Sequence, residues 1–487
     1  MTRKNVLITT FIALGLRMFL LINAPLWYDE SFTAWVSAQP FGAMIDALMG
    51  DTHPPLYYLI TWAMVHISGT NPVRMAFWLR LPSAIFSAAA VYQTWMISQS
   101  VRWPKRAEIA ALVMMTISPF QVFYAQEARM YAFMQFFVLL AFWAILDRRW
   151  KLATVSMIAL VYTQNYGLFY MVALGLAALY RERAALRNTG TWLRLGLVFG
   201  LPILTWLPWA WVMFYQMSII EGGYWITPPT AGAVISAVYM VLFGLAQAEP
   251  IHILTVVGAV ALLILAFLRL IQKRPQGFVP LAILGAVPVI LPVIVSWVWS
   301  PIFLYRGLIA AAPALYLIIG WWWGRISKPV LRWYAVTLVA PVMLVGLVNY
   351  YAHNPKGGTD RLLGVVNAIR AEYQEGDIIY HVDAGSMVGW WTYGDKEIPQ
   401  FKAPLPPTCQ PGEETLGGLS AHTRRALGIR EVPLDEIRHN RVFVVWGQGP
   451  TSRSCWADYY AYLIDGEPFH LSEDSRYVLS GVWLYDN

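Results

Sequence analysis

Charged residues are scarce in this sequence. Only 13% of its 487 residues are Asp, Glu, Lys or Arg, whereas a soluble globular protein carries about 25%. Hydrophobic residues reach 58%, and the 24 tryptophans and 26 tyrosines suit a protein with an aromatic belt at each membrane interface. The hydrophobic excess lies in residues 1–350, which excludes a soluble globular protein for that part. The remaining residues have the composition of a soluble domain.

Cysteine is almost absent as well. The two cysteines, Cys409 and Cys455, both lie in the polar part, and they lack the paired spacing of a zinc site. If this part lies outside the cell, the two could form a disulfide; if it lies inside, they stay thiols. The sequence leaves both states open.

A basic patch interleaved with aromatic residues is missing from the polar part, which argues against nucleic acid as a partner. Residues 1–350 hold 23 Lys and Arg against 10 Asp and Glu, whereas residues 351–487 hold 12 against 18. The basic excess is therefore a signal of membrane topology.

No small-residue cleavage site follows the apolar run from Val6 to Ile22, so we expect a retained first helix and not a signal peptide.

Long apolar runs predict the membrane spans. A spanning helix needs about 20 apolar residues. Eleven candidates are found, near residues 5–24, 78–98, 107–122, 131–146, 152–165, 167–180, 192–214, 253–270, 278–299, 303–323 and 333–351. The stretch 232–247 is also apolar, and we expect it to be a half-helix at the outer surface.

Basic clusters orient these spans, because cytoplasmic loops are enriched in Lys and Arg. With the N-terminus inside, the loops predicted inside carry Arg102/Lys105/Arg106, Arg148/Arg149/Lys151, Arg181/Arg183/Arg187, Lys273/Arg274 and Arg325/Lys328/Arg332. The loops predicted outside carry only Arg74, Arg80, Arg129 and Arg306. A crossing at 232–247 would put Lys273 on the wrong side. We therefore expect a multi-pass protein of the plasma (inner) membrane with a cytoplasmic N-terminus.

The expected fold is an α-helical polytopic membrane protein of about 11 transmembrane helices with a C-terminal α/β extracytoplasmic domain. Residues 1–352 would form the transmembrane domain, with a long first outer loop at 25–77, and residues 353–487 the soluble domain. In the latter, a helical pattern runs from Asp360 to Tyr373, and strand-like runs follow at 377–382, 441–446 and 477–485.

Ionisable residues outside the basic clusters gather at the predicted outer face. They are Asp29, Glu30, Asp51, His53, Arg80, Glu127, Arg129, Glu221 and Arg306. Charge at membrane level is costly, so such residues usually mark a functional cavity. The presence of both signs suits a carboxylate that works beside a phosphate held by arginines.

The acidic pair Asp29 and Glu30 directly follows the first apolar run. A carboxylate here could deprotonate an acceptor hydroxyl. The alternative, which the dipeptide alone favours, is a simple helix cap, since acidic residues favour a helix N-terminus. Two prolines after His53 predict a rigid turn that holds this histidine at the start of a helix. His53 would then hydrogen-bond a phosphate or share a metal with Asp51, or else be a solvated residue of an interfacial turn.

The segment 124–131 predicts the start of a membrane helix, on which Glu127 and Tyr131 share one face and Arg129 points elsewhere. A buried charge pair that only adds rigidity is the alternative. Arg306 opens another predicted helix on the outer side, where it either meets a lipid phosphate or extends to the interface. Arg17 lies inside the first helix, and we expect it to pair with a carboxylate of the cavity.

Four motifs occur in a familiar order. They are Trp27-Tyr28-Asp29-Glu30, Asp51-Thr52-His53-Pro54-Pro55-Leu56-Tyr57-Tyr58, Arg80-Leu81-Pro82-Ser83 and Tyr124-Ala125-Gln126-Glu127-Ala128-Arg129-Met130-Tyr131. Together they resemble the prokaryotic branch of the glycosyltransferase family 39 group. That group has the GT-C fold, and protein O-mannosyltransferases and lipid A aminoarabinose transferases are its relatives. The resemblance covers about residues 1–350 and is densest in 1–170.

The resemblance implies roles for the outer residues. The acidic pair, Asp29 and Glu30, would be catalytic, with the aspartate as the base, and Arg129 and Arg306 would hold the donor phosphate. We expect further donor contacts from His53 and Arg80, and support of the acceptor or of the structure from Glu127, Tyr131 and Asp51. Relatives often have Thr-His-Tyr where this chain has Thr163-Gln164-Asn165-Tyr166, which puts a metal site in doubt. No cofactor is required for certain, and a divalent metal stays an option.

The expected reaction moves a sugar, with inversion, from a polyprenyl-phosphate donor to an outward-facing lipid, glycan or protein acceptor, in contact with membrane lipids. A transporter or flippase would need a polar path through the midplane and commonly has inverted repeats. The predicted midplane is nearly free of charge apart from Arg17, and no internal repeat is visible. A non-catalytic membrane scaffold would not explain carboxylates and arginines gathered at one face.

Overall fold

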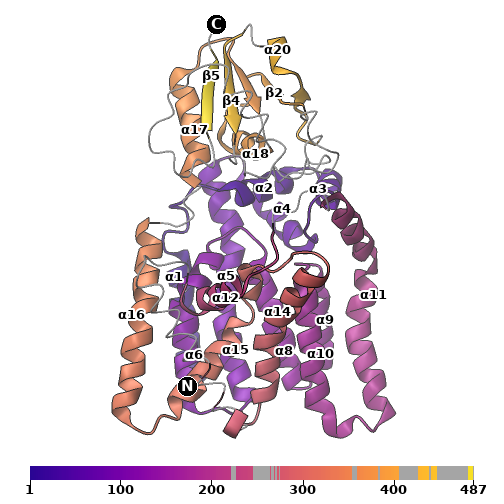
Figure 1. The fold of residues 1–487 in the computed structure, drawn as a ribbon, viewed down its shortest axis with the longest axis vertical. Coiled ribbons are helices and arrows are strands. Elements are labelled where there is room, and N and C mark those ends of the chain that lie inside the picture. The colour runs from indigo at the N-terminus through magenta and orange to yellow at the C-terminus, as the bar shows by residue number, and fades with distance from the viewer. Residues whose placement is uncertain are drawn as a thin grey trace. The chain divides into compact units, whose positions relative to one another are not determined.

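A computed structural model of the chain describes two compact units (Figure 1). The first comprises Met1–Leu21, Arg80–Trp209 and Ile226–Asn354, and the second Ile22–Leu79, Ala210–Trp225 and Pro355–Asn487. Within these ranges, the residues that the structure describes are 1–220, 226–244, 264, 268, 271–273, 275–353, 359–381, 384–404, 426–437, 440–446 and 481–485.

Helices build the first unit. They are α1 (Arg3–Met18), α5 (Pro72–Ser100) from Arg80 onward, α6 (Lys105–Ile117), α7 (Pro119–Ala125), α8 (Tyr131–Leu146), α9 (Trp150–Val161), α10 (Gly167–Glu182), η1 (Arg183–Ala185), α11 (Thr189–Ile220) as far as Trp209, α12 (Ala231–Phe243), α14 (Phe278–Val298), η2 (Tyr305–Leu308), α15 (Ala312–Gly324) and α16 (Pro329–His353). Helix α8 packs on α9 and α10, α10 on α14, α14 on α15, α15 on α6, and α6 on α1. Apolar runs become helices here because a bilayer offers the backbone no hydrogen-bonding partner.

Three of the described helices are long and apolar enough to cross a membrane, namely Pro72–Ser100, Thr189–Ser218 and Phe278–Val298. The pair α6 and α7, bent by 50°, would be a fourth. The predicted span 131–146 coincides with α8. The predicted span 253–270 lies outside the described residues except for two positions, so the number eleven stays a prediction. Helix α12 has 13 residues, too few for a span of about 20, as expected of a half-helix.

The bend between α6 and α7 has a simple chemical cause. Pro119 has no N–H, so the carbonyl of Met115 lacks its usual helical donor. Arg17 supplies one: its Nη2 donates to Met115 O at 2.9 Å, and its Nη1 contacts Thr116 O at 3.4 Å. Its Nε donates to Ser87 Oγ at 2.8 Å. The expectation that Arg17 pairs with a carboxylate is therefore wrong; it caps carbonyls at the end of a helix, where cations are favoured.

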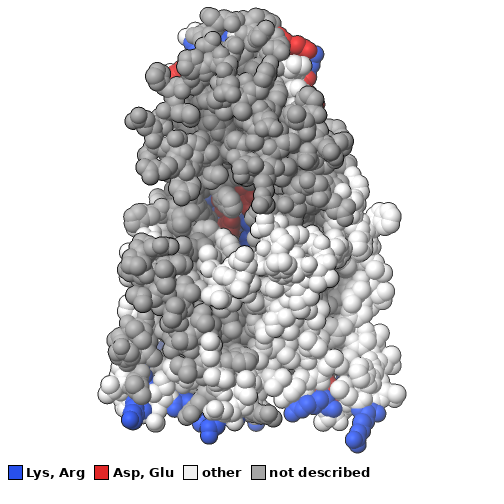
Figure 2. All heavy atoms as spheres, in the orientation of Figure 1, with Lys and Arg blue, Asp and Glu red and all other residues white. Residues whose placement is uncertain are grey.

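Basic side chains gather along the lower edge of the face drawn in Figure 2. The exposed basic residues of the predicted inside loops include Arg102, Lys105, Arg106, Arg148, Arg149, Lys151, Arg181, Arg183, Arg187, Arg325 and Lys328. Such a cluster is what cytoplasmic loops carry.

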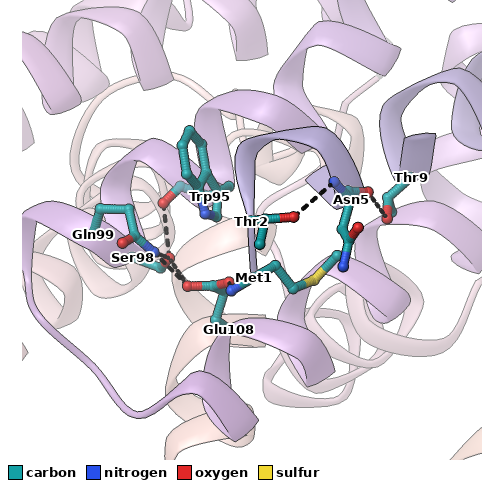
Figure 3. Close-up of polar contacts among 8 residues, drawn as sticks. All are labelled: Met1, Thr2, Asn5, Thr9, Trp95, Ser98, Gln99 and Glu108. Atoms are coloured by element: carbon teal, nitrogen blue, oxygen red, sulfur yellow. Dashed lines mark hydrogen bonds and ion pairs between the residues drawn. The ribbon is translucent and has the colours of Figure 1, made fainter. Parts of the chain in front are cut away.

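Two buried carboxylates in this unit have structural partners. Glu108 accepts hydrogen bonds from Ser98 and Gln99 and pairs with the Met1 amino group (Figure 3). Glu182 lies 2.6 Å from Arg148 Nε and 3.4 Å from Arg194 Nη2. Since a buried charge needs a partner, both residues are accounted for without any catalytic role.

The second unit combines helices with a mostly parallel sheet. Its helices are α2 (Tyr28–Ala38), α3 (Phe41–Met49), α4 (Leu56–Ser68), α17 (Thr359–Glu372), α18 (Ala384–Tyr393) and α20 (Leu434–Ile437). Its strands are β1 (Ile378–His381), β2 (Gln400–Lys402), β3 (Arg430–Glu431), β4 (Val442–Trp446) and β5 (Gly481–Tyr485). The order is β3-β2-β1-β4-β5, with only β5 antiparallel to its neighbour. The central strand β1 is buried along its whole length, as is usual in parallel sheets.

The predicted helix and the three predicted strands of this segment are found in α17, β1, β4 and β5. The sequence pattern missed α18 and the short strands β2 and β3. The division of the chain at residue 352 and the placement of the C-terminal part outside the membrane stay predictions. Cys409, Cys455 and Glu221 lie outside the described residues.

His381 ends the central strand and is 1% exposed. Its Nδ1 lies 3.1 Å from Ser386 Oγ, and its Nε2 lies 3.3 Å from Gln400 Oε1. Burial lowers the pKa of His381 to about 4, because the imidazolium would lose its water, and the bond to Gln400 opposes this shift. The ring is therefore neutral in the folded domain at pH 7.

We expect the sheet to lose stability as the pH falls from about 6.5 to about 4. In this window the unfolded state binds a proton at His381 that the folded state does not, and the loss totals roughly 3 kcal/mol. Hydrogen exchange of β1 and α18 in the full-length protein, corrected for the intrinsic effect of pH, measures it. His381→Gln keeps the polar contacts but cannot titrate, so its pH dependence should be flatter. Equal slopes for both proteins would contradict the assignment.

Candidate active site

The acidic pair lies in the first turn of α2, within the second unit. The residue at the N-cap is Trp27, which makes no side-chain capping bond, so neither Asp29 nor Glu30 is the cap. The helix N-terminus nevertheless favours both negative charges. Glu30 is fully buried, whereas Asp29 is partly exposed. Of the two, Asp29 is thus the carboxylate that an acceptor molecule reaches more easily.

The start of α2 is tied to α18. Tyr393 Oη, at the end of α18, accepts from the Leu26 N–H and donates to the Leu26 carbonyl at 3.1 Å. The first turn then closes through Ser31 N–H to Trp27 O at 2.7 Å. No sequence motif pointed to Tyr393, because its partner lies 367 residues away.

The second predicted motif forms the expected turn. Asp51 Oδ2 lies 2.8 Å from His53 Nδ1, and Thr52 Oγ1 lies 3.0 Å from the same nitrogen. Helix α4 begins at Leu56, directly after Pro55 as its N-cap. A direct hydrogen bond therefore joins Asp51 to His53. The carboxylate fixes which ring nitrogen of His53 carries the proton.

In the first unit, Glu127 and Arg129 lie in the turn between α7 and α8. The prediction that Glu127 shares a helical face with Tyr131 is wrong, since α7 ends at Ala125 and α8 begins at Tyr131. The helix is interrupted because the Gln126 side chain makes long-range hydrogen bonds. Its Nε2 donates to Arg17 O at 2.9 Å and to Phe19 O at 2.6 Å, which ties the chain to the end of α1.

Further hydrogen bonds fix the same turn. Tyr350 donates to Gln126 Oε1 at 2.6 Å, and Ser83 Oγ lies 3.3 Å from the Arg129 carbonyl. One turn earlier on α5, the buried Arg80 donates to Leu21 O at 2.8 Å. The buried side chains of Glu127 and Arg129 thus start from a backbone held on two sides. Gln126 stands inside one of the quoted motifs, but nothing in the pattern assigned it this role.

Arg306 lies beside two tyrosines. Its guanidinium carbon is 5.6 Å from the ring centroid of Tyr131, a cation–π distance, and the Tyr124 ring meets the Tyr131 ring edge-on at 5.2 Å. Glu127 and Arg306 both act electrostatically on Tyr124. The structure therefore brings together four residues of the predicted outer face of this unit, Glu127, Tyr131, Tyr124 and Arg306.

The backbone around Arg306 differs from the expected helix start. Arg306 lies in the 3-10 turn η2, and α15 begins only at Ala312, because Pro313 occupies the first turn of that helix. The turn is fixed by Tyr170, whose hydroxyl donates to Gly307 O at 2.9 Å. A Cβ on Gly307 would lie 2.6 Å from the Tyr166 ring, so only glycine fits here. The Thr163–Tyr166 segment thus supports Arg306 from the junction between α9 and α10.

A metal site is not formed by the described residues, among which no group of three or more His, Cys, Asp or Glu side chains is placed to hold an ion.

No protein-family model matches the chain, and no curated protein sequence matches it. Solved structures do. ArnT from Cupriavidus metallidurans in the apo state aligns with a TM-score of 0.60 and 14% identity over 99% of this chain and 98% of that chain. The same protein bound to undecaprenyl phosphate aligns with a TM-score of 0.56 and 13% identity over 100% and 99%.

A third match is AglB from Archaeoglobus fulgidus, an archaeal oligosaccharyltransferase in complex with an inhibitory peptide and a dolichol-phosphate. Its TM-score is 0.50 and its identity 11%, over 90% of this chain and 68% of that chain. Likeness at such low identity establishes a common fold. The chain therefore has the GT-C fold, as its four motifs predict.

Proposed function

We propose that this protein is a membrane glycosyltransferase that moves a sugar from a polyprenyl-phosphate donor to an acceptor on the outer face of the membrane. The observation that carries the proposal is the GT-C fold of the chain. The chain also has a partly exposed aspartate at a helix N-terminus and, separately, a buried Arg129 and an Arg306 guanidinium over the Tyr131 ring. Two proteins of the same fold bind undecaprenyl phosphate or dolichol-phosphate.

The proposed reaction is a single displacement with inversion. Asp29 takes the proton of an acceptor hydroxyl, whose oxygen attacks the anomeric carbon of the sugar. The bond from that carbon to the phosphate oxygen breaks, and polyprenyl phosphate leaves. Arg129 and Arg306 stabilise the charge that grows on the phosphate, as preorganised cations do. The proton on Asp29 then passes to water.

Other residues have supporting roles in this proposal. Glu30 orients Asp29 or the helix end, and His53 and Arg80 make further contacts to the donor. Tyr131 holds the Arg306 guanidinium, Glu127 balances its charge, and Asp51 fixes the His53 ring.

The direct test uses purified protein in nanodiscs. Polyprenyl phosphates that carry single hexoses, pentoses or amino sugars are offered together with a membrane extract as acceptor, and products are identified by mass spectrometry. Transfer of any sugar with release of polyprenyl phosphate supports the proposal. A protein that moves the intact donor between leaflets without breaking its glycosyl phosphate bond would be a flippase.

We also propose that the N-terminus is cytoplasmic and the sheet domain extracytoplasmic. Single cysteines are placed at the exposed positions Glu375 and Gly190 in a background with Cys409 and Cys455 replaced by serine. An impermeant thiol reagent should label the Glu375 site in intact spheroplasts and reach the Gly190 site only after lysis. The reverse pattern would overturn the orientation.

A further inference from the structure

The Tyr393 hydroxyl makes an unusual two-point contact within the second unit. It accepts from the N–H of Leu26 and donates to the carbonyl of the same residue at 3.1 Å. Leu26 is fully buried and Tyr393 is 8% exposed, so water competes little for these groups. One hydroxyl thus bonds both polar groups of a buried backbone residue, and backbone groups without hydrogen bonds are costly to bury.

Tyr393 is held firmly in turn. It is the last residue of α18, and its own carbonyl accepts from Arg370 Nη2 on α17 at 2.6 Å. Helix α18 packs against α17, β1, β4 and α2. The position of the hydroxyl is therefore set by the parallel sheet and its helices.

Leu26, which the Tyr393 hydroxyl holds, lies only three residues before the acidic pair. Ser31 Oγ contacts Leu26 O at 3.3 Å, and Thr33 Oγ1 donates to the Asp29 carbonyl at 3.0 Å. Asp29 is the second residue of α2, so a backbone shift at Leu26, three residues before it, would also move the backbone that carries its carboxylate.

We propose that Tyr393 is a positioning residue for the transfer reaction, through which the sheet domain sets the place of the Asp29 carboxylate. The inference rests on the proposed role of Asp29 as the base. It gives the C-terminal segment an indirect part in catalysis, through the place of Asp29.

Tyr393→Phe tests this, because it removes the hydroxyl and keeps the ring. Displacing a catalytic group by about 1 Å can cost up to roughly 100-fold in rate. We therefore expect kcat to fall about 10-fold or more while the KM for the lipid donor stays within about twofold. Tyr380→Phe is the matched control: Tyr380 is fully buried on β1 in the same domain and donates to Val432 O at 3.0 Å. It should lose similar stability and keep its kcat.

Hydrogen exchange of residues 26–34 provides a readout that needs no turnover. Tyr393→Phe should speed exchange there, and Tyr380→Phe should not. If exchange at 26–34 is unchanged in Tyr393→Phe, or if both variants lose kcat equally, the positioning role is refuted. If the wild-type protein transfers no sugar but Tyr393→Phe still speeds hydrogen exchange at residues 26–34, the contact between Tyr393 and Leu26 does hold this segment. The proposed function fails instead.

Discussion

Asp29→Asn is expected to lower kcat for sugar transfer by about 10²–10⁴-fold, because the amide keeps the shape of the carboxylate but cannot accept the acceptor proton. Binding of the lipid donor should persist, since Asp29 acts on the acceptor. Glu30→Gln should have a milder effect if this buried carboxylate only orients its neighbour. The assay is transfer from a polyprenyl-phosphate sugar in nanodiscs, with donor binding measured in parallel.

Asp46→Asn is the control for that experiment. Asp46 is an exposed carboxylate on α3 of the same unit, so its neutralisation changes the charge equally without touching the start of α2. It should turn over at the wild-type rate. A wild-type rate for Asp29→Asn as well would remove Asp29 as the base, and Glu127 would be the next carboxylate to replace.

Arg129→Ala and Arg306→Ala should each raise the KM for the lipid donor by about 10–100-fold, the effect of losing a hydrogen bond to a charged group. Lysine should rescue only part of the loss, because a fork of donors becomes a point charge. Arg325 offers a control of the same geometry, with its guanidinium carbon 5.4 Å from the Trp321 ring compared with 5.6 Å for Arg306 over Tyr131. Donor KM values that rise equally in Arg325→Ala would show a general packing defect and not a phosphate clamp.

The sequence correctly predicted the helices whose position depends on neighbouring residues. The apolar run 131–146 is found unchanged as α8, and two prolines before Leu56 start α4 where expected. Both follow from rules that act within a few residues: backbone groups in lipid bond along their own helix, and proline fixes the turn before it.

The errors occur where distant residues decide the structure. The sequence pattern predicts a helix that runs through Glu127. In the structure, Gln126 hydrogen-bonds to the end of α1, and the helix stops before it. Charge alone predicts a carboxylate partner for Arg17, yet its guanidinium donates to the Met115 carbonyl, which lacks its helical donor because Pro119, 102 positions after Arg17, has no N–H. The role of Tyr393 could not be predicted from the sequence for the same reason, because its partner Leu26 is distant in the chain. Periodicity and charge cannot predict such contacts, because each joins groups that only the tertiary fold brings together.

The bond from Arg17 to the carbonyl of Met115 also constrains how the chain is made. Arg17 lies in the last turn of α1 and leaves the ribosome 98 residues before Met115. The bond to the Met115 carbonyl can therefore form only after α6 has been synthesised. Arg17→Leu would insert more readily by itself but would leave the break at Pro119 without its donor.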